Sequence, residues 1–418
     1  MEDPSPFTET TGTARFAAYR ELTAAGPVRQ VTLFTGVRVW VVAGYDEARA
    51  LLTHPGVVRS TDEVPHRDVL PAELAAAMNT HLLSANPPEH TRLRALVSAG
   101  FTRRRVAELE PRITRLAGGF ADAMAAAATG PDSAPGTGSA PPGGTAESSA
   151  PVDLVARYAN PLPVAVIAEL VGVPATDRDA FRHWSSIVSY GAVYPADVWV
   201  GATREMVDYL RGLIAAKQAR PADDLLSALL AVRAESGDRL SVDELTSMVF
   251  LLLAAGHETT AHLIGTATYR LLTAPDRLAL LRAEPDRLPG AIEELLRLDG
   301  PVQSTIPAWT TTEVRLGEVT IPAGQVVLAA VLAANRDPRR YAEPDRLDLD
   351  RPPAQHLAFG HGIHHCLGAP LARLEARIAL RTLLDRFPRL RLADPDTEPE
   401  RHPALLFNGL RALPVRLH

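Results

Sequence analysis

One short stretch near the C-terminal end combines residue types that could bind a metal. Cys366 is the only cysteine among the 418 residues. Glycines at positions 360, 362 and 368 surround it, and glycine permits the positive φ angles that let backbone N–H groups approach a sulfur atom. A helix is expected to begin directly after the last of these glycines, which favours the thiolate over the thiol. A lone cysteine is more often an inert buried residue, but this setting favours metal ligation.

A second candidate group for chemistry lies in the segment Ala255–Thr260. Here Glu258 and Thr259 stand side by side in an otherwise apolar helical run, where an acid beside an alcohol is costly unless both are used or hydrogen-bonded. The Thr259 hydroxyl could also bond back to its own helix. A zinc-protease helix is excluded, because His257 and His262 are five residues apart and so about 140° apart around a helix.

Two charged pairs at helical spacing complete the set of candidates. Glu294 and Arg297 are three residues apart, a spacing that usually means an exposed ion pair worth a few tenths of a kcal/mol. His90 and Arg94 follow the pair Pro87–Pro88 and are four residues apart, so both can point to one side of a helix. Taken alone, the second pair could be no more than a solvated basic face.

These candidates are carried by elements that the sequence pattern predicts to be mostly helical. The capping-box pattern at Ser241–Glu244 opens the helix that holds Glu258, and this helix ends before Pro275. A strong amphipathic helix covers Ala369–Arg386. A hairpin is predicted over Val28–Ala43, and the sequence also has two later strand-like runs, Val319–Ile321 and Val326–Leu332. The predicted fold class is mainly α with a small β portion.

Composition narrows the class of protein. Hydrophobic residues make up 46% and charged residues 22%, as in ordinary globular chains, and we expect one domain over residues 1–418. Residues 130–151 are rich in Ser, Gly, Pro and Ala and predict a flexible loop inserted in that domain. The net charge of −6 argues against a nucleic-acid binder. Without a signal peptide pattern, a disulfide or a long apolar run, the expected location is the cytoplasm and no membrane is expected.

The segment Phe359–Gly368 matches a long family pattern at every defining position. The pattern is Phe-x-x-Gly-x-His-x-Cys-x-Gly, and the segment resembles the heme-binding loop of the cytochromes P450, the heme-thiolate monooxygenases. The other candidate segments resemble further elements of this family and occur in its order, so the resemblance spans essentially the whole chain. It implies a triangular helical prism around one heme b, which is iron protoporphyrin IX.

The resemblance also implies a role for each candidate residue. Cys366 would ligate the iron with Phe359 beside it, and Glu258 and Thr259 would deliver protons during oxygen activation. The turn Pro344–Leu347 would bring in a third charged residue, so that a buried triad supports the cysteine loop, although Leu347 replaces the usual Phe; the expected members are Glu294, Arg297 and Arg346. The heme propionates would contact His90, Arg94, His364 and, with less support, His356. The family's further propionate arginine corresponds to Ala308, so one contact is missing or is supplied differently.

The activity implied by the resemblance is insertion of one oxygen atom from O₂ into a lipophilic small molecule, such as a polyketide, macrolide or terpenoid. No dinucleotide-binding fingerprint is present, so electrons from NAD(P)H should arrive through a separate ferredoxin and ferredoxin reductase. Two alternatives remain open: peroxide-driven oxidation or oxidative ring coupling at the same site, and a non-catalytic heme sensor or carrier.

The resemblance also implies where the ligands would bind. The substrate pocket should be lined by the segments 61–86, 187–199, 251–255, 304–306 and 406–408. A basic surface that could receive an acidic ferredoxin is expected from six arginines on two neighbouring helices, Arg103, Arg104, Arg105, Arg373, Arg377 and Arg381. The alternative for these arginines is a solvated surface without a partner.

Overall fold

The computed structural model describes residues 6–418 except 35, 60–69, 130–149, 190–193, 233–236 and 353–354. The loop predicted for residues 130–151 therefore lies, apart from its last two residues, outside the described part of the chain.

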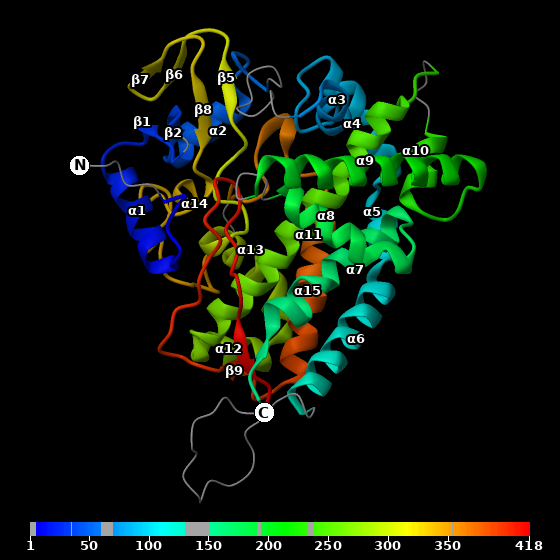
Figure 1. Ribbon diagram of the computed structural model, residues 1–418. Helices are drawn as coiled ribbons and strands as arrows, with labels where there is room; N and C mark the ends of the chain where they lie inside the picture. The colour runs from blue at the N-terminus through cyan, green and yellow to red at the C-terminus, as the bar shows by residue number, and fades with distance from the viewer. Residues whose placement is uncertain are drawn as a thin grey trace, which may run out of the picture.

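Helices form most of the described chain and fill the right and lower parts of Figure 1. Four short helical segments in this part of the chain are not α-helical. One is a π-helical turn, Val155–Ala159, and three are 3₁₀ turns, Ala175–Asp177, Pro285–Arg287 and Gly362–His364. The α-helices are α1 (Gly12–Ala24), α2 (Tyr45–Thr53), α3 (Ala72–Asn79), α4 (Glu89–Gly100), α5 (Arg103–Glu108), α6 (Glu110–Thr129), α7 (Pro161–Val171), α8 (Arg178–Ser189), α9 (Ala196–Ala219), α10 (Leu225–Ala231), α11 (Val242–Leu272), α12 (Pro275–Ala283), α13 (Leu288–Asp299), α14 (Val331–Ala334) and α15 (Ala369–Arg386).

The strands gather mainly at one corner, at the upper left of Figure 1. One sheet has the order β1-β2-β8-β5-β3, a second has the order β4-β10-β9, and β6 pairs with β7. The strands are β1 (Val28–Thr32), β2 (Arg38–Val42), β3 (Val57–Val58), β4 (Val152–Asp153), β5 (Ala308–Thr310), β6 (Val314–Leu316), β7 (Val319–Ile321), β8 (Val326–Ala329), β9 (Arg391–Leu392) and β10 (Pro414–Arg416). The small sheets beside a large helical body confirm the predicted fold class.

Most of the predicted elements are present with close bounds. β1 and β2 form the predicted antiparallel hairpin, with Val28 opposite Val42. The capping box at Ser241 is formed in both directions with Glu244, and α15 has the predicted ends. The second strand-like run is wrong beyond Ala329, because β8 stops there and α14 begins at Val331. A short apolar run does not distinguish strand from buried helix, and alanine favours the helix.

The long helix α11 is the central element of the helical body. It contacts α7, α15, α9, α13 and α3, and most of its second half is buried. By length and composition α11 is the one described helix that could cross a membrane, but 67% of its most apolar window is buried inside the protein. Burial on that scale is what the core helix of a globular domain shows. One face of α11 and the loop before α15 border a cavity in the interior of the protein.

Candidate active site

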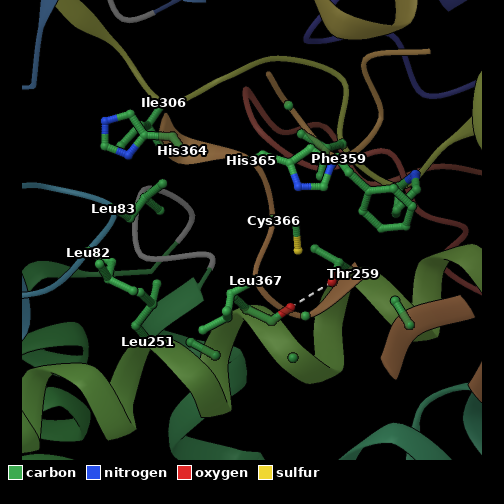
Figure 2. Close-up of a pocket in the computed structure, with 18 of the residues that line it drawn as sticks. Leu82, Leu83, Leu251, Thr259, Ile306, Phe359, His364, His365, Cys366 and Leu367 are labelled. Carbon is green, nitrogen blue, oxygen red and sulfur yellow. Dashed lines mark hydrogen bonds between the residues drawn. The ribbon is translucent and has the colours of Figure 1, made fainter. Parts of the chain in front are cut away.

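A cavity of about 470 Å³ separates α11 from the loop that carries Cys366. In Figure 2 the Cys366 sulfur points from this loop toward α11, where Thr259 lies, and Leu82, Leu83 and Leu251 close one side. Each of the five segments predicted to line the pocket contributes at least one lining residue, among them His81, Val188, Leu251, Ile306 and Leu406. For the described residues these segments do line the cavity, whereas residues 61–69 and 190–193 lie outside the described part of the chain.

The loop before α15 is shaped by glycines, as the sequence suggests. Gly360 and Gly362 have φ angles of +72° and +71°, which L side chains rarely adopt. A Cβ at Gly362 would also lie 3.0 Å from the Leu52 carbonyl oxygen. The Cys366 N–H donates to the Phe359 carbonyl at 2.9 Å and closes the loop on itself. The backbone therefore fixes where the sulfur points.

The start of α15 is expected to favour the thiolate of Cys366, but burial has the opposite effect. Burial raises the pKa of the Cys366 thiol above its ordinary value, and the N–H groups of Gly368 and Ala369 oppose this without reversing it. The N–H groups of Gly368 and Ala369, with the charge of Arg94, thus favour the thiolate only in part. A bound cation at the sulfur would supply the missing stabilisation, as metal ions do for coordinating thiols.

Cationic side chains converge at one end of the cavity. His90, Arg94 and His364 line it, with the rings of His90 and His364 at 4.6 Å between centroids. Nε2 of His90 is buried without a hydrogen-bond partner, and Arg94 donates to the His365 carbonyl at 2.8 Å. Burial, together with the nearby charge of Arg59, lowers the pKa of His364 to about 4. A group with anionic arms would accept a hydrogen bond from the unpaired nitrogen, pair with the charge of Arg94 and offset the loss of water at the two histidines.

The residues around the cavity therefore fit a heme. A thiol faces the cavity from one side, an apolar helix face lies opposite, and the end of the cavity is cationic. When bound, heme would supply oxygen activation, and a thiolate ligand is the one that favours O–O cleavage. Cys366 would hold the metal, Phe359 lies at the cavity wall, and His90, Arg94 and His364 would hold the carboxylates.

Of the acid and the alcohol on α11, only the alcohol, Thr259, lines the cavity. Thr259 lines the cavity, together with Gly256, Thr260 and Leu263 of the same helical stripe. Its hydroxyl donates to the Ala255 carbonyl at 2.6 Å, drawn as the dashed line in Figure 2. The helix thus adopts the alternative in which the Thr259 hydroxyl bonds back to its own backbone.

Glu258 does not line the cavity; its carboxylate lies between two histidines. The Oε1 atom is 3.3 Å from Nε2 of His257, and Oε2 is 3.5 Å from Nε2 of His262. Burial opposes ionisation of Glu258, but the His257 hydrogen bond and the charges of His262 and His402 outweigh it and lower the pKa to about 2. Glu258 is therefore ionised and held in place one helix position away from the cavity face.

The buried charged triad exists, but one of its predicted members is wrong. Arg297 donates to both carboxylate oxygens of Glu294, at 2.7 and 2.8 Å. The third member is Arg351, whose Nε donates to Glu294 at 3.1 Å. Arg346 instead pairs with Glu343 and Asp348 at the surface, and only its backbone carbonyl contacts the triad. The chain folds back after Leu347, so Arg351, five residues after Arg346, reaches the buried carboxylate.

We expect Arg351→Ala to lower the free energy of unfolding by about 1–3 kcal/mol, because it leaves Glu294 short of a charged partner in a buried site. Arg346→Ala is the matched control and should stay within about 0.5 kcal/mol of the wild type, because its side chain pairs only at the surface. Chemical denaturation of the purified proteins measures both. Equal losses in the two variants would contradict the assignment of Arg351.

His356 is the other predicted site residue that the structure places elsewhere. Its Nε2 lies 3.2 Å from Oε2 of Glu293, and its Nδ1 accepts from the Ala358 N–H at 3.2 Å. Because both ring nitrogens are used in this way and the residue does not line the cavity, its expected propionate contact is wrong for this arrangement. Glu293 lies directly before the triad glutamate and also binds Arg373, so His356 helps to fix the cysteine-side helices together.

Glu375 on α15 is a buried acid at the cavity that the sequence did not single out. It is 1% exposed, and its Oε2 makes no hydrogen bond in the described structure. Burial raises the pKa of Glu375 well above its ordinary value, so folding favours the neutral form of this acid. The cavity wall can thus carry an acid without adding a negative charge beside the cysteine loop.

The neutral Glu375 predicts a pH dependence of stability. Because the folded state holds this proton more tightly than the unfolded state, stability falls as pH rises from the ordinary glutamate pKa of 4.5 toward the raised folded value. The loss is about 1.4 kcal/mol for each unit of pKa difference. Glu375→Gln cannot ionise and should unfold with a flatter pH profile between pH 4.5 and neutrality. If the free energy of unfolding of Glu375→Gln depends on pH as steeply as that of the wild type, Glu375 ionises normally.

The arginine-rich surface predicted for ferredoxin docking is largely neutralised by neighbouring acids. Four of its six arginines form ion pairs, between 2.7 and 2.9 Å: Arg104 with Glu108, Arg377 with Glu110, Arg381 with Asp385 and Arg373 with Glu293. The expected strongly basic face is therefore wrong for these residues. Surface ion pairs of this kind leave a mixed polar surface, which gives little long-range attraction.

Comparisons with known proteins agree on the family. The sequence model described as Cytochrome P450 matches residues 198–411. The chain is 44% identical to the cytochrome P450 monooxygenase PikC of Streptomyces venezuelae over 96% of this chain and 90% of that protein. It is 40% identical to 6-deoxyerythronolide B hydroxylase of Saccharopolyspora erythraea, again over 96% of each. The structure of the tirandamycin C-bound P450 monooxygenase TamI superposes with a TM-score of 0.83 at 39% identity, covering 96% of this chain and 97% of that one. With the cysteine loop and the cavity in place, this chain belongs to the cytochrome P450 family of heme-thiolate monooxygenases.

Proposed function

We propose that this P450 monooxygenase binds heme b through Cys366 and inserts one oxygen atom from O₂ into a large lipophilic natural product of the macrolide or polyketide class. The observation that carries the proposal is the cavity itself, which has the Cys366 sulfur on one wall and the Thr259 stripe of α11 on the other. One similar protein is named 6-deoxyerythronolide B hydroxylase, and the structure of another, TamI, has tirandamycin C bound, which supports this substrate class.

The cavity lining supports a bulky ligand with few polar groups. Most of the side chains away from the cationic end are apolar, including Leu82, Leu83, Ile167, Phe250, Leu251 and Phe407. The polar exceptions are few: His81, whose pKa burial lowers to about 4, stays neutral and can act as a hydrogen-bond donor or acceptor. Sites of this kind gain affinity from apolar burial and orient the ligand with a small number of polar contacts.

We further propose that electrons reach the heme from NAD(P)H through a ferredoxin and its reductase in the cytoplasm. The chain carries no nucleotide-binding fingerprint of its own, so this reducing chain would consist of separate proteins. Steady product formation that depends on NAD(P)H and both redox proteins would support this route. Turnover with peroxide alone, and none with O₂ and reductant, would contradict it.

The decisive experiment is a spectroscopic substrate screen. Purified holoprotein is titrated with macrolide, linear polyketide and terpenoid scaffolds, and the change in heme spin state is followed by difference absorbance. A saturable low-to-high-spin shift with a macrolide or polyketide, followed by a hydroxylated or epoxidised product, is the expected result. A shift confined to terpenoids, or none with any large scaffold, would overturn the proposed substrate class.

A further inference from the structure

Arg59 lies beside the position where the family resemblance implies a cation and this chain has Ala308. β3 and β5 pair antiparallel, with Val57 opposite Thr310 and Val58 opposite Trp309. β3 ends at Val58, and continuing its register by one residue would set Arg59 opposite Ala308. Side chains of directly opposed residues are about 4.5–5.5 Å apart at Cβ, so an arginine on one strand can occupy space next to a small residue on the other.

The backbone of Arg59 is fixed by a side chain rather than by the sheet. Its N–H donates to Oδ1 of Asn86 at 2.8 Å, and its carbonyl accepts from Nδ2 of Asn86 at 2.5 Å. Asn86 directly precedes the two prolines that lead into α4, the helix that carries His90 and Arg94. Arg59 is thus tied to the segment that brings the other cations to the cavity.

The guanidinium group of Arg59 is only partly used by the protein. Nη1 donates to the Ile306 carbonyl at 2.6 Å and to the Pro307 carbonyl at 3.3 Å, directly before Ala308. Among the described residues these are its only side-chain hydrogen bonds, and no carboxylate lies within ion-pair distance. The N–H groups of Nε and Nη2 therefore have no acceptor among the described residues, and Arg59 lines the cavity.

The surroundings of Arg59 call for an anion. It stands at the cationic end of the cavity with His90, Arg94 and His364, and Figure 2 shows His364 next to Ile306, whose carbonyl Arg59 binds. Burial lowers the pKa of Arg59 to about 10, so it stays charged at neutral pH without a counter-ion from the described protein. A planar guanidinium with free parallel donors is suited to a carboxylate.

We propose that Arg59 binds a propionate carboxylate of the heme and so replaces, from the opposite strand, the arginine that is absent at Ala308. This inference rests on the proposed function, because it requires heme in the cavity. It adds a cofactor-binding residue whose sequence position gives no hint of the role, because Arg59 reaches the neighbourhood of Ala308 only through the β3–β5 pairing and its hydrogen bonds to the Ile306 and Pro307 carbonyls.

The first test measures heme retention rather than turnover. The holoprotein is mixed with an excess of a heme-scavenging apoglobin, and the rate of heme transfer is followed by absorbance. Arg59→Ala should release heme roughly ten- to a hundredfold faster than the wild type, the worth of a charged hydrogen bond. Arg315→Ala on β6 is the matched control and should leave the rate unchanged, because it removes an exposed arginine whose one hydrogen bond to a described residue goes to the Gly317 carbonyl.

A second arm separates a propionate contact from a purely structural role. Apoproteins are reconstituted with heme or with its dimethyl ester, which lacks the carboxylates. Esterification should speed heme release at least about tenfold more in the wild type than in Arg59→Ala, because only the wild type loses the Arg59 contact. Equal effects of esterification in both proteins would overturn the proposal. Arg59→Gln, which can keep a hydrogen bond to the Ile306 carbonyl, gives the same comparison if the alanine variant folds poorly.

A third arm removes the arginine from position 59 and introduces one at position 308. The double variant Arg59→Ala, Ala308→Arg should recover most of the lost heme affinity, whereas Ala308→Arg alone should not improve it. A double variant that releases heme as fast as Arg59→Ala would contradict the compensation. The wild-type spectrum of reduced protein under carbon monoxide distinguishes the two levels of failure: without a thiolate-type band the proposed function itself fails, whereas with that band and an unaffected Arg59→Ala only this inference fails.

Discussion

Cys366→Ser is expected to abolish the red-shifted Soret band that reduced, carbon monoxide-bound heme shows when its other ligand is a thiolate. The chain has no second cysteine to replace the sulfur. The loop closed by the Cys366 to Phe359 hydrogen bond aims this one side chain into the cavity. The expected effect is complete loss of the thiolate spectrum, because serine oxygen is a poor ligand for the same metal.

The control for this prediction is the neighbouring histidine. His365 also lines the cavity and lies one residue from Cys366, so it is the nearest alternative ligand on the same loop. His365→Ala should keep the thiolate band at wild-type intensity per heme. A wild-type spectrum of the histidine-ligated kind, lost in His365→Ala and kept in Cys366→Ser, would reject Cys366 as the ligand.

The cysteine loop was predictable because its information is contiguous. The glycines, the cysteine and the start of the following helix all lie within Phe359–Ala369, and each acts on its immediate neighbours. The capping box at Ser241 and the Val28–Ala43 hairpin are local in the same sense. Such features need only short-range backbone preferences, which the order of residues states directly.

The errors arise where distant segments meet. The choice between Arg346 and Arg351 depends on how the chain from Ala342 to Arg351 folds back onto α13, where Arg351 also donates to the Ala342 carbonyl at 2.7 Å. Two arginines five residues apart look alike in a sequence. The role of Arg59 could not be predicted for the same reason, because the pairing of β3 with β5 joins residues about 250 positions apart.

The orientation of Glu258 could have been derived from the sequence alone. At 100° per residue, Gly256, Thr259, Thr260 and Leu263 fall within one stripe about 100° wide, and Glu258 lies outside that stripe. Thr259 shares the stripe of Gly256 and Leu263, whereas Glu258 lies four residues from His262 on another side of α11. The partner histidines then explain why the acid is ionised and fixed. The 3.6-residue periodicity of the helix predicts on which side of α11 Glu258 lies, whereas the family motif gives only the order of the residues.

Thr259→Ala is expected to keep heme and substrate binding but to divert electrons from product to peroxide. The Thr259 hydroxyl faces the cavity opposite Cys366, and its oxygen still has lone pairs after it donates to the Ala255 carbonyl. It can therefore hold a water or accept a proton-bearing group at the cavity wall, and removing it breaks proton delivery. Product formed per NAD(P)H should fall by up to about a hundredfold, the lower end of what positioned proton-transfer groups contribute.

Thr260 gives this prediction a matched control on the same helix. Thr260 also lines the cavity and its hydroxyl also bonds back to the helix, to the Gly256 carbonyl at 3.1 Å, so Thr260→Ala repeats the loss of one helix-bonded hydroxyl in the next residue. Only Thr259→Ala should uncouple NAD(P)H consumption from product, and Thr259→Ser should restore the coupling. Peroxide release and product are measured in the same reaction. If turnover driven by added peroxide equals that of the wild type while the O₂ reaction is lost, Thr259 acts in oxygen activation; if both variants stay fully coupled, proton delivery runs through another group.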